Sequence, residues 1–408
     1  MDRSPYAHHW MLDESVTFLN HGAFGACPRR VLAVQDRFRE AMECEPVQFL
    51  WRRIETLLDE ARDVLARFIG ADAEDVALVT NATAGVNAVL RSLEFAPGDE
   101  LLNTDHEYGA CRNVVDFVAA RCGARVVTAE VPFPIGSDEQ IVESVLHRIT
   151  GRTRLVMFSH VTSPTGLIWP VERLVGEIQG RGVDVLVDGA HAPGMVPLNV
   201  EALGAAYYTG NCHKWMCAPK GAGFLHVRRD RQHLVRPTVI SHGASSRRTN
   251  RSRFLMEFDW VGTVDPTPWL AIPAAIEFIS TLMDGGLAAH RAHNRSLALE
   301  ARRMLCSTLK ISPPAPESMI GSLAAVPLSD DADDADVIHP ARKLTSPISR
   351  LQDQLWEQYR IDVPVMSWPS APHRLLRVSA HAYNNVVQYA RLCDALRRLS
   401  ETGRQERA

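Results

Sequence analysis

Short apolar runs alternate with longer amphipathic stretches through the first half of the chain. Residues 76–79, 154–158 and 185–187 have the length and continuous hydrophobicity of buried strands. Stretches between them, such as residues 139–149, place apolar residues at helical spacing. This alternation predicts an α/β fold with a mostly parallel sheet, helices on its faces, and a functional site along the carboxyl ends of the strands.

Residues 221–225 are predicted to form a strand that returns antiparallel, and the Ser-, Arg- and Asn-rich residues 241–253 a mobile loop. After these residues the pattern changes and predicts a second, smaller unit. The later pattern mixes helices with short strands, which is typical of an α+β domain. Its expected strands lie near residues 320–326, 363 and 376, and its expected helices at residues 287–309, at 346–359 and from 385 onward. An acidic loop at 329–336 and a frayed end at 401–408 complete this part.

A chain of 408 residues can bury one large core and a smaller one, so we expect two domains. We place an N-terminal active-site segment at residues 1–25, a large domain at 26–265 and a small domain at 266–408. The formal net charge of -4 and the lack of a long basic run argue against nucleic acid or an anionic membrane as a partner.

The sequence contains no signal-peptide pattern and no apolar segment of membrane-spanning length, so we expect a cytoplasmic protein. Its eight cysteines are scattered without a C-x-x-C pair. They predict neither a disulfide framework nor a zinc site, and we assign no metal ligands.

The candidate chemistry gathers between residues 185 and 215. Asp188 ends an apolar run, His191 follows in a Gly/Pro-bounded loop, and a second apolar run leads to His213 and Lys214. A lysine amine that bonds to an aldehyde, with a carboxylate to pair a pyridinium nitrogen, is what pyridoxal phosphate chemistry needs. The plainer alternative is that Asp188 is a helix cap or turn former.

The scarcity of lysine favours the cofactor interpretation. Arginine supplies nearly all the positive charge, and the chain has only four lysines: Lys214, Lys220, Lys310 and Lys343. A lysine retained among apolar and aromatic neighbours therefore suggests that an amine is required there.

Two other loops are open to two interpretations. The loop after residues 76–79 leads through Asn81 and Thr83 into a helix, which is a ready anion site or else a helix cap without a ligand. Asn20 and His21 lie in a glycine-punctuated loop and, judged from the residues alone, are turn formers.

An ordered set of motifs resembles the class V aminotransferase family of fold-type-I pyridoxal phosphate enzymes, and within it the group of isopenicillin N epimerase. In chain order the motifs are NHGAFG, TNATAGVN, DHEY, SHVTSPTGL, VDGAHAPG, HKW, GT before Asp265, and LRVSAHAYN. The resemblance covers nearly the whole chain. It implies a mostly parallel seven-stranded sheet with helices on both faces, a small α+β C-terminal domain, and pyridoxal 5'-phosphate as cofactor.

The resemblance also implies individual roles. Lys214 would bond to the cofactor and move the Cα proton, Asp188 would bind the pyridine nitrogen, and His106 would stack on the ring; these are the implied catalytic residues. His191 would lie beside the phenolic oxygen, and Thr263 would reach the cofactor of the neighbouring subunit in a homodimer. The other implied cofactor-binding residues are Ala82, Thr83, Ser163, Thr209, Asn211 and His213. The implied substrate-binding residues are Arg377, Asn20, His21 and Tyr108, with Arg377 taking the α-carboxylate.

The chain departs from the family pattern in two places. Family members usually carry a hydroxyl residue and a glycine where this chain has Asn211 and Cys212, so the phosphate contact is altered or moves to Thr209. A persulfide-forming desulfurase needs a nucleophilic cysteine in the C-terminal half, and none lies between Lys310 and Tyr383.

The resemblance favours removal of the Cα proton from an amino-acid-like substrate, with epimerisation as the reaction, in natural-product metabolism. The alternative is β-elimination by a C–S lyase or desulfhydrase acting on cysteine or an S-substituted cysteine, and transamination comes third. Tyr108, His21 and His106 are candidates for a second acid or base. The alternative from another class is a protein that only binds a ligand. Loss of the lysine or the acid would have favoured that alternative, and both residues are present.

Overall fold

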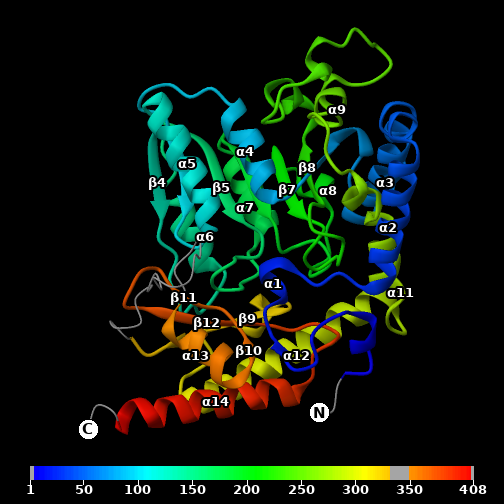
Figure 1. Ribbon diagram of the computed structural model, residues 1–408. Coiled ribbons are helices and arrows are strands. Elements are labelled where there is room, and N and C mark those ends of the chain that lie inside the picture. Colours follow the sequence, from blue (N-terminus) through cyan, green and yellow to red (C-terminus); the bar gives the residue numbers. More distant parts are fainter. Residues whose placement is uncertain (1–3, 331–348, 406–408) are drawn as a thin grey trace.

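A seven-stranded sheet forms the centre of the larger domain in the computed structural model, which describes residues 4–330 and 349–405 (Figure 1). The strand order is β2-β8-β7-β6-β5-β3-β4, and β8 pairs antiparallel with both neighbours while the other pairs are parallel. The strands are β2 (Val76–Val79), β3 (Glu100–Thr104), β4 (Arg125–Ala129), β5 (Thr153–Ser159), β6 (Asp184–Gly189), β7 (Tyr207–Asn211) and β8 (Gly223–Val227). The predicted mostly parallel sheet and the returning strand are both confirmed.

Helices cover both faces of this sheet because its central strands are apolar on both sides. In β6, Leu186 packs with helices α4 and α5, whereas Val185 and Val187 pack with α6 and α7 on the opposite face. The bounds of these helices are α4 (Ala82–Ser92), α5 (Gly109–Cys122), α6 (Glu139–Leu146) and α7 (Val171–Gln179). Continuous apolar strands of this kind are typical of a sheet that is buried on both faces.

The N-terminal helices and the connections around the sheet complete this side of the molecule. They are η1 (Ala7–His9), α1 (His21–Phe24), α2 (Arg29–Cys44), η2 (Gln48–Arg53), α3 (Ile54–Ile69), η3 (Ala73–Asp75), α8 (Val200–Leu203), η4 (Arg229–Leu234), η5 (His242–Ser245), α9 (Arg253–Phe258), α10 (Thr267–Leu270) and α11 (Ile272–Thr281). Helices α10 and α11 contact α2 and α3 as well as the next helix, so the boundary at residue 265 stays a prediction.

The smaller domain is built on a three-stranded antiparallel sheet in the order β11-β12-β9, which packs against α12, and α12 packs in turn against α14 (Figure 1). Its elements are α12 (Gly286–Leu309), η6 (Glu317–Met319), β9 (Leu323–Leu328), α13 (Arg350–Tyr359), β10 (Ile361–Asp362), β11 (Val365–Ser367), β12 (Arg374–Ser379) and α14 (Val386–Gln405). Strand β1 (Thr17–Phe18) pairs parallel with β10, so the N-terminal segment is fastened to this domain. Helix α1 then lies between the two domains (Figure 1).

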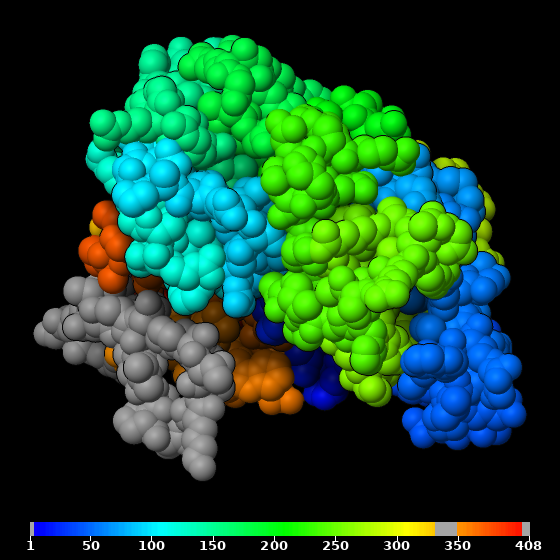
Figure 2. All heavy atoms as spheres, turned by 90° about the horizontal axis from the view of Figure 1, so that it is seen from above, coloured from blue at the N-terminus to red at the C-terminus, as the bar shows by residue number. Residues whose placement is uncertain are grey.

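Residues 241–253, expected to be a mobile loop, are instead anchored by ion pairs. Arg248 binds Glu55 at 2.6 Å and Arg251 binds Asp59 at 2.7 Å, and both acids lie on α3. Figure 2 shows this yellow-green part of the chain beside the blue N-terminal helices. The arginines that made the segment look like a solvated loop are the groups that anchor it. The sequence pattern did not show this because the acidic partners are almost 200 residues away in the sequence.

Several predicted ends differ from the observed ones. Helix α14 reaches Gln405, so part of the end expected to fray is helical. The predicted helix at 346–359 begins at Arg350 instead, and its first expected residues fall outside the described part of the chain, as does most of the acidic loop. Among the described residues no single helix has the length and apolar composition to cross a membrane; the bent pair Thr267–Thr281 and Gly286–Leu309, meeting at 72°, passes that test by length and composition only.

Candidate active site

A cavity of about 430 Å³ opens at the carboxyl ends of β5, β6 and β7. Its size is within the range of ordinary small-molecule sites, about 300–1,000 Å³. The predicted residues that line it are Ala82, Thr83, Tyr108, Ser163, Asp188, His191, Asn211, His213 and Lys214. The sheet topology therefore brings together most of the residues proposed for cofactor binding.

Lys214 lies near the start of the connection between β7 and β8, residues 212–222. Its Nζ lies 3.1 Å from Nε2 of His191. Burial and the positive charge of Arg377 together lower the pKa of Lys214 to about 8, while Asp188 opposes the shift. About a tenth of this amine is therefore neutral at pH 7, the form that attacks a carbonyl carbon.

Asp188 ends β6 and is buried beside the cavity. Its Oδ1 accepts a hydrogen bond from the backbone N–H of Ala190 at 2.9 Å, and its Oδ2 accepts one from the Cys111 thiol at 3.3 Å. Burial raises its pKa, although the bond from Ala190 opposes this shift. Within the described chain no arginine or lysine forms an ion pair with it, so the site fits a ligand that brings its own positive N–H.

The amino end of α4 faces the same cavity. The Asn81 side chain caps this helix by accepting from the Ala84 N–H, and Asn211 Oδ1 accepts from the Ala82 N–H at 2.8 Å. Thr83 lines the cavity beside them. A helix end of this kind attracts an anion such as phosphate. Asn211, the departure from the family pattern, is thus bound to the anion-attracting helix end.

Thr209 is not brought to the cavity. Its hydroxyl donates to the Phe224 carbonyl at 2.8 Å and lies under α4, where a Cβ on Gly85 would come within 2.2 Å of it. His213 does line the cavity, and its Nδ1–H donates to the Ala222 carbonyl at 3.1 Å. Burial lowers the pKa of His213 to about 4, so its ring is neutral at neutral pH.

His106, expected to stack on the cofactor, is not among the described residues that line this cavity. Its Nε2–H donates to the Val131 carbonyl at 2.9 Å, and its Nδ1 lies 2.8 Å from the Thr165 hydroxyl. Its ring packs edge-on against Trp368, with centroids 4.6 Å apart. The turn instead directs the next aromatic residue, Tyr108, into the cavity.

His21 lies behind Lys214 and does not line the cavity, although Ala23 and Phe24 of the same helix do. Its Nε2–H donates to the Lys214 carbonyl at 3.0 Å, and its Nδ1 accepts from the Tyr383 hydroxyl at 2.7 Å. Burial lowers its pKa to about 3. His21 therefore holds the backbone of the lysine.

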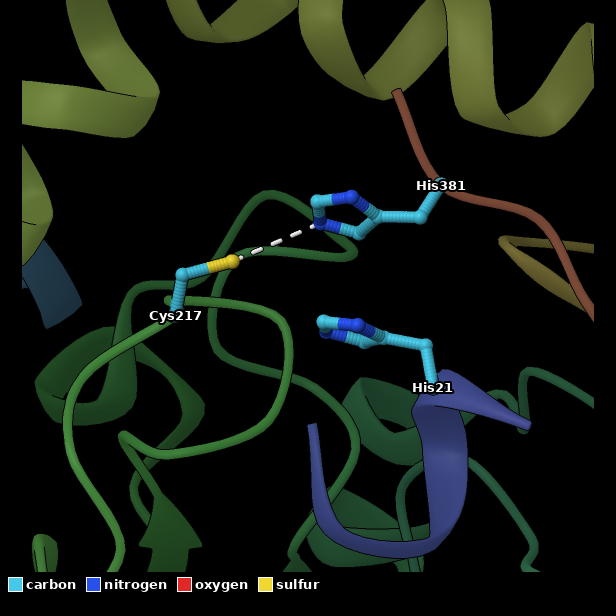
Figure 3. A group of neighbouring side chains, drawn as sticks. All are labelled: His21, Cys217 and His381. Carbon is cyan, nitrogen blue, oxygen red and sulfur yellow. Dashed lines mark hydrogen bonds between the residues drawn. The ribbon is translucent and has the colours of Figure 1, made fainter. Parts of the chain in front are cut away.

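Figure 3 shows His21 stacked against His381, whose Nε2 lies 3.4 Å from the Cys217 thiol. The two rings are 4.1 Å apart and inclined by only 20°. Both ring nitrogens of His21 are engaged, by the Tyr383 hydroxyl and the Lys214 carbonyl, so neither has a free lone pair for a metal ion. The cluster is packing that joins both domains behind the lysine.

Arg377 lies in β12 and is buried behind Ser163; it is not itself among the described residues that line the cavity. Its Nη1 donates to the Ser163 carbonyl and, at 3.1 Å, to the Ser163 hydroxyl, while Nε has no hydrogen-bond partner. Burial lowers its pKa to about 10. A buried guanidinium with a free donor and no carboxylate bound to it in the described chain fits the α-carboxylate of a substrate.

Two predicted residues lie elsewhere. Asn20 donates to the Asp362 carboxylate at 3.1 Å, which joins the N-terminal segment to the small domain. Thr263 is exposed and outside the described cavity lining, so its proposed contact across a subunit boundary stays a prediction. Sequence reasoning missed Cys111, which contacts Asp188, and Trp215, which contacts His191. No motif signals Cys111; Trp215 directly follows the lysine.

Together these groups form a pyridoxal phosphate site: an amine of lowered pKa, a buried acid without a cation, and a helix end for the phosphate. The family described as aminotransferase class-V matches residues 18–339. The chain is 39% identical over 406 residues to an isopenicillin N epimerase of Amycolatopsis lactamdurans, covering 96% of each chain. It is 30% identical over 426 residues to a putative L-cysteine desulfhydrase of Oryza sativa subsp. japonica, covering 98% of this chain and 86% of the relative.

Solved structures agree on the fold. A C-DES mutant with glycine covalently linked to its PLP cofactor has a TM-score of 0.79 and 23% identity, and the match covers 96% of this chain and 99% of that one. The chain belongs to the class V aminotransferase family. It is a pyridoxal-phosphate-dependent enzyme, as the sequence resemblance implied.

Proposed function

We propose that this enzyme removes the Cα proton of an amino-acid-like substrate and epimerises that carbon, in natural-product metabolism. The observation that carries the proposal is Lys214, a partly neutral amine that lines the same cavity as Asp188, in a chain 39% identical to an isopenicillin N epimerase. Bound pyridoxal phosphate supplies an electron sink for the charge that a broken Cα bond leaves behind.

Three residues of the chain bind the substrate, move the proton and support the cofactor. Arg377 binds the substrate carboxylate with a fork of donors and fixes the direction of the Cα–H bond. Lys214 takes the proton at Cα, because its amine has a pKa near 8 and can both accept and return it. Asp188 keeps a positive charge on the pyridine nitrogen, which strengthens the sink.

Epimerisation needs a second acid on the face of Cα opposite to Lys214, unless the intermediate turns in the site. Of the three candidates, His21 and His106 are occupied by other hydrogen bonds and lie outside the described cavity lining. Tyr108 lines the cavity and its side chain is half exposed. We therefore propose Tyr108 as this second acid.

The alternative is a C–S β-lyase, which expels a thiol from the same carbanion. It is favoured by the 30% identity to a putative L-cysteine desulfhydrase along nearly the whole chain. This route needs no donor on the second face, so Tyr108 would then have no role as an acid. The two reactions differ in which bonds of the substrate survive.

Reaction in deuterium oxide separates the two functions. An epimerase returns intact substrate of both configurations carrying deuterium at Cα. Tyr108→Phe should still exchange the proton of the starting enantiomer but form little of the other one, and cofactor-treated Lys214→Ala gives the background. Thiol and 2-oxo acid released from an S-substituted cysteine, without deuterium in recovered amino acid, would assign the enzyme as a lyase.

We also propose a cytoplasmic homodimer with shared active sites. Phe24, which lines the cavity, is 74% exposed, and Trp51 on η2 is 75% exposed. Large apolar side chains left in solvent are typical of a surface that a partner covers. Sedimentation that finds an active monomer at assay concentration would contradict the dimer. Restored activity after mixing inactive Lys214→Ala and Thr263→Ala subunits would support shared sites.

A further inference from the structure

Three side chains form a hydrogen-bonded row beside the cavity: Trp215, His191 and Lys214. The indole Nε1 of Trp215 lies 3.2 Å from Nδ1 of His191, and Nε2 of His191 lies 3.1 Å from Nζ of Lys214. The Trp215 and His191 side chains are almost completely buried. Water therefore has little access to the His191 ring, and its two protein contacts determine where its proton resides.

The chemistry of the indole decides between the two forms of the imidazole. An indole N–H can only donate, so Nδ1 of His191 must be the accepting nitrogen. The ring proton of neutral His191 then lies on Nε2 and points toward the Lys214 amine. A doubly protonated ring would place two N–H groups face to face at Trp215 and lose this bond.

The surroundings also keep the His191 ring neutral. Burial lowers the pKa of His191 well below its ordinary value, and the positive charges of Lys214 and Arg377 lower it further. His21 and His213 act in the same direction. The acid that lines the same cavity, Asp188, is bound to Ala190 and Cys111 instead.

We propose that Trp215 is a positioning residue that fixes His191 as a neutral hydrogen-bond donor directed at the group carried by Lys214. The inference rests on the proposed function only in that Lys214 carries the cofactor. His191 then stabilises a negatively charged oxygen there by donation, and it does not exchange protons with the substrate. Trp215, the last residue of the HKW motif, thereby gains a role that the resemblance did not imply.

The tautomer of His191 can be measured without any reaction. In protein labelled with ¹⁵N-histidine, long-range ¹H–¹⁵N spectra distinguish the two nitrogens, and His191→Gln identifies the signals that belong to this ring. We expect a single neutral form with the proton on Nε2 at about pH 9, where the Lys214 amine is neutral and can accept a hydrogen bond from Nε2–H. A proton on Nδ1, or a doubly protonated ring, in wild-type cofactor-free protein at that pH would overturn the proposal.

Trp215→Phe keeps an aromatic ring against His21 but removes the N–H donor. We expect His191 to populate both tautomers in this variant. In loaded protein, loss of the fixed donor should raise the apparent pKa of the visible cofactor band by about 1, as the loss of one hydrogen bond to a charged group commonly does.

Trp10→Phe is the matched control, because Trp10 is also buried and its indole donates to the Ala26 carbonyl. It should leave the His191 signals and the band unchanged. Unchanged signals and band in Trp215→Phe would also overturn the role of Trp215. Wild-type protein that forms no band would instead contradict the proposed function, while the spectra of the cofactor-free protein still decide the tautomer.

Discussion

Two buried groups of charges in this molecule are built in opposite ways. Where residues 241–253 meet α3, Arg62 and Arg251 contact Asp59 and Asp259, so each charge in this group has a partner of opposite charge. At the cavity, Lys214, Asp188 and Arg377 are buried or partly buried without forming an ion pair with one another in the described structure. The first group fastens a segment to α3, and the second leaves its charges for a ligand.

The pKa shifts express the same contrast. Burial acts to lower the pKa of Arg251, but the hydrogen bonds that it donates to Asp59 and its attraction to Asp259 raise the pKa above the ordinary value. Burial lowers the pKa of Arg377 to about 10, with little opposition. A buried charge without a partner is costly, and such costs are typical of functional sites. The contrast thus separates structural from functional charges without reference to any motif.

Replacing the lysine should have the largest effect. Lys214→Ala removes the amine that bonds to the cofactor, so the visible band and Cα exchange should both be lost. Lys310→Asn is the control, because Lys310 is an exposed C-cap of α12 with φ 57°, a conformation that asparagine tolerates. Borohydride reduction followed by peptide mapping should recover the cofactor on Lys214. Recovery on another lysine would refute the site.

Replacing the acid should slow turnover without preventing cofactor attachment. The neutral amide in Asp188→Asn cannot stabilise a positive charge on the pyridine nitrogen. We therefore expect turnover to fall about 10²- to 10⁴-fold, the range typical of a lost acid or base. The band should persist, because Lys214 is unchanged. Steady-state kinetics at saturating cofactor measure the loss, and near-normal turnover would remove Asp188 from the chemistry.

Replacing the unpaired arginine should weaken substrate binding. Arg377→Gln loses a charged fork that binds the carboxylate, so KM should rise by about 10- to 100-fold, equivalent to about 1.5–3 kcal/mol. For a substrate analogue that carries an amide in place of the carboxylate, wild type and variant should have similar KM values. Equal KM values for the acid in both proteins would mean that Arg377 serves only to hold Ser163.

The lowered pKa of Lys214 predicts how cofactor attachment depends on pH. Neutral amine attacks the aldehyde, so the rate of band formation on cofactor-free protein should fall about tenfold per pH unit below 8 and level off above it. Stopped-flow absorbance measures this rate. A plateau reached only near pH 10 would show that the amine is not perturbed.

The paired charges should affect stability and leave the chemistry nearly intact. Arg62→Met leaves two acids, Asp59 and Asp259, to share the single charge of Arg251, so we expect a loss of up to about 3 kcal/mol in the free energy of unfolding. The double variant Arg62→Met/Asp259→Leu should recover much of this, because no charge is then left unpaired. Urea unfolding with parallel activity assays measures both. A large drop in turnover in the folded single variant would erase the distinction between the two groups of charges.

The sequence by itself determined the sheet and the position of the reactive lysine. Strands β5 and β6 are continuous apolar runs, and residues at the carboxyl ends of neighbouring parallel strands meet at one edge, so Asp188 and the loop carrying Lys214 had to converge. The helix end at Ala82 followed from the Asn81 cap in the same way. Hydrophobic periodicity and turn chemistry depend on neighbouring residues, so a single sequence is enough to show them.

Only the tertiary structure decided which side of each loop faces the cavity. His106 and Tyr108 are two residues apart, yet Val131 and Thr165 hold the first outside the lining and leave the second in it. His21 likewise points at the Lys214 backbone because Tyr383, more than 300 residues later, binds its other nitrogen. Pairs such as Arg251–Asp59 and Trp215–His191 depend on which elements pack together, and that information lies in contacts between distant parts of the chain, which no local pattern records.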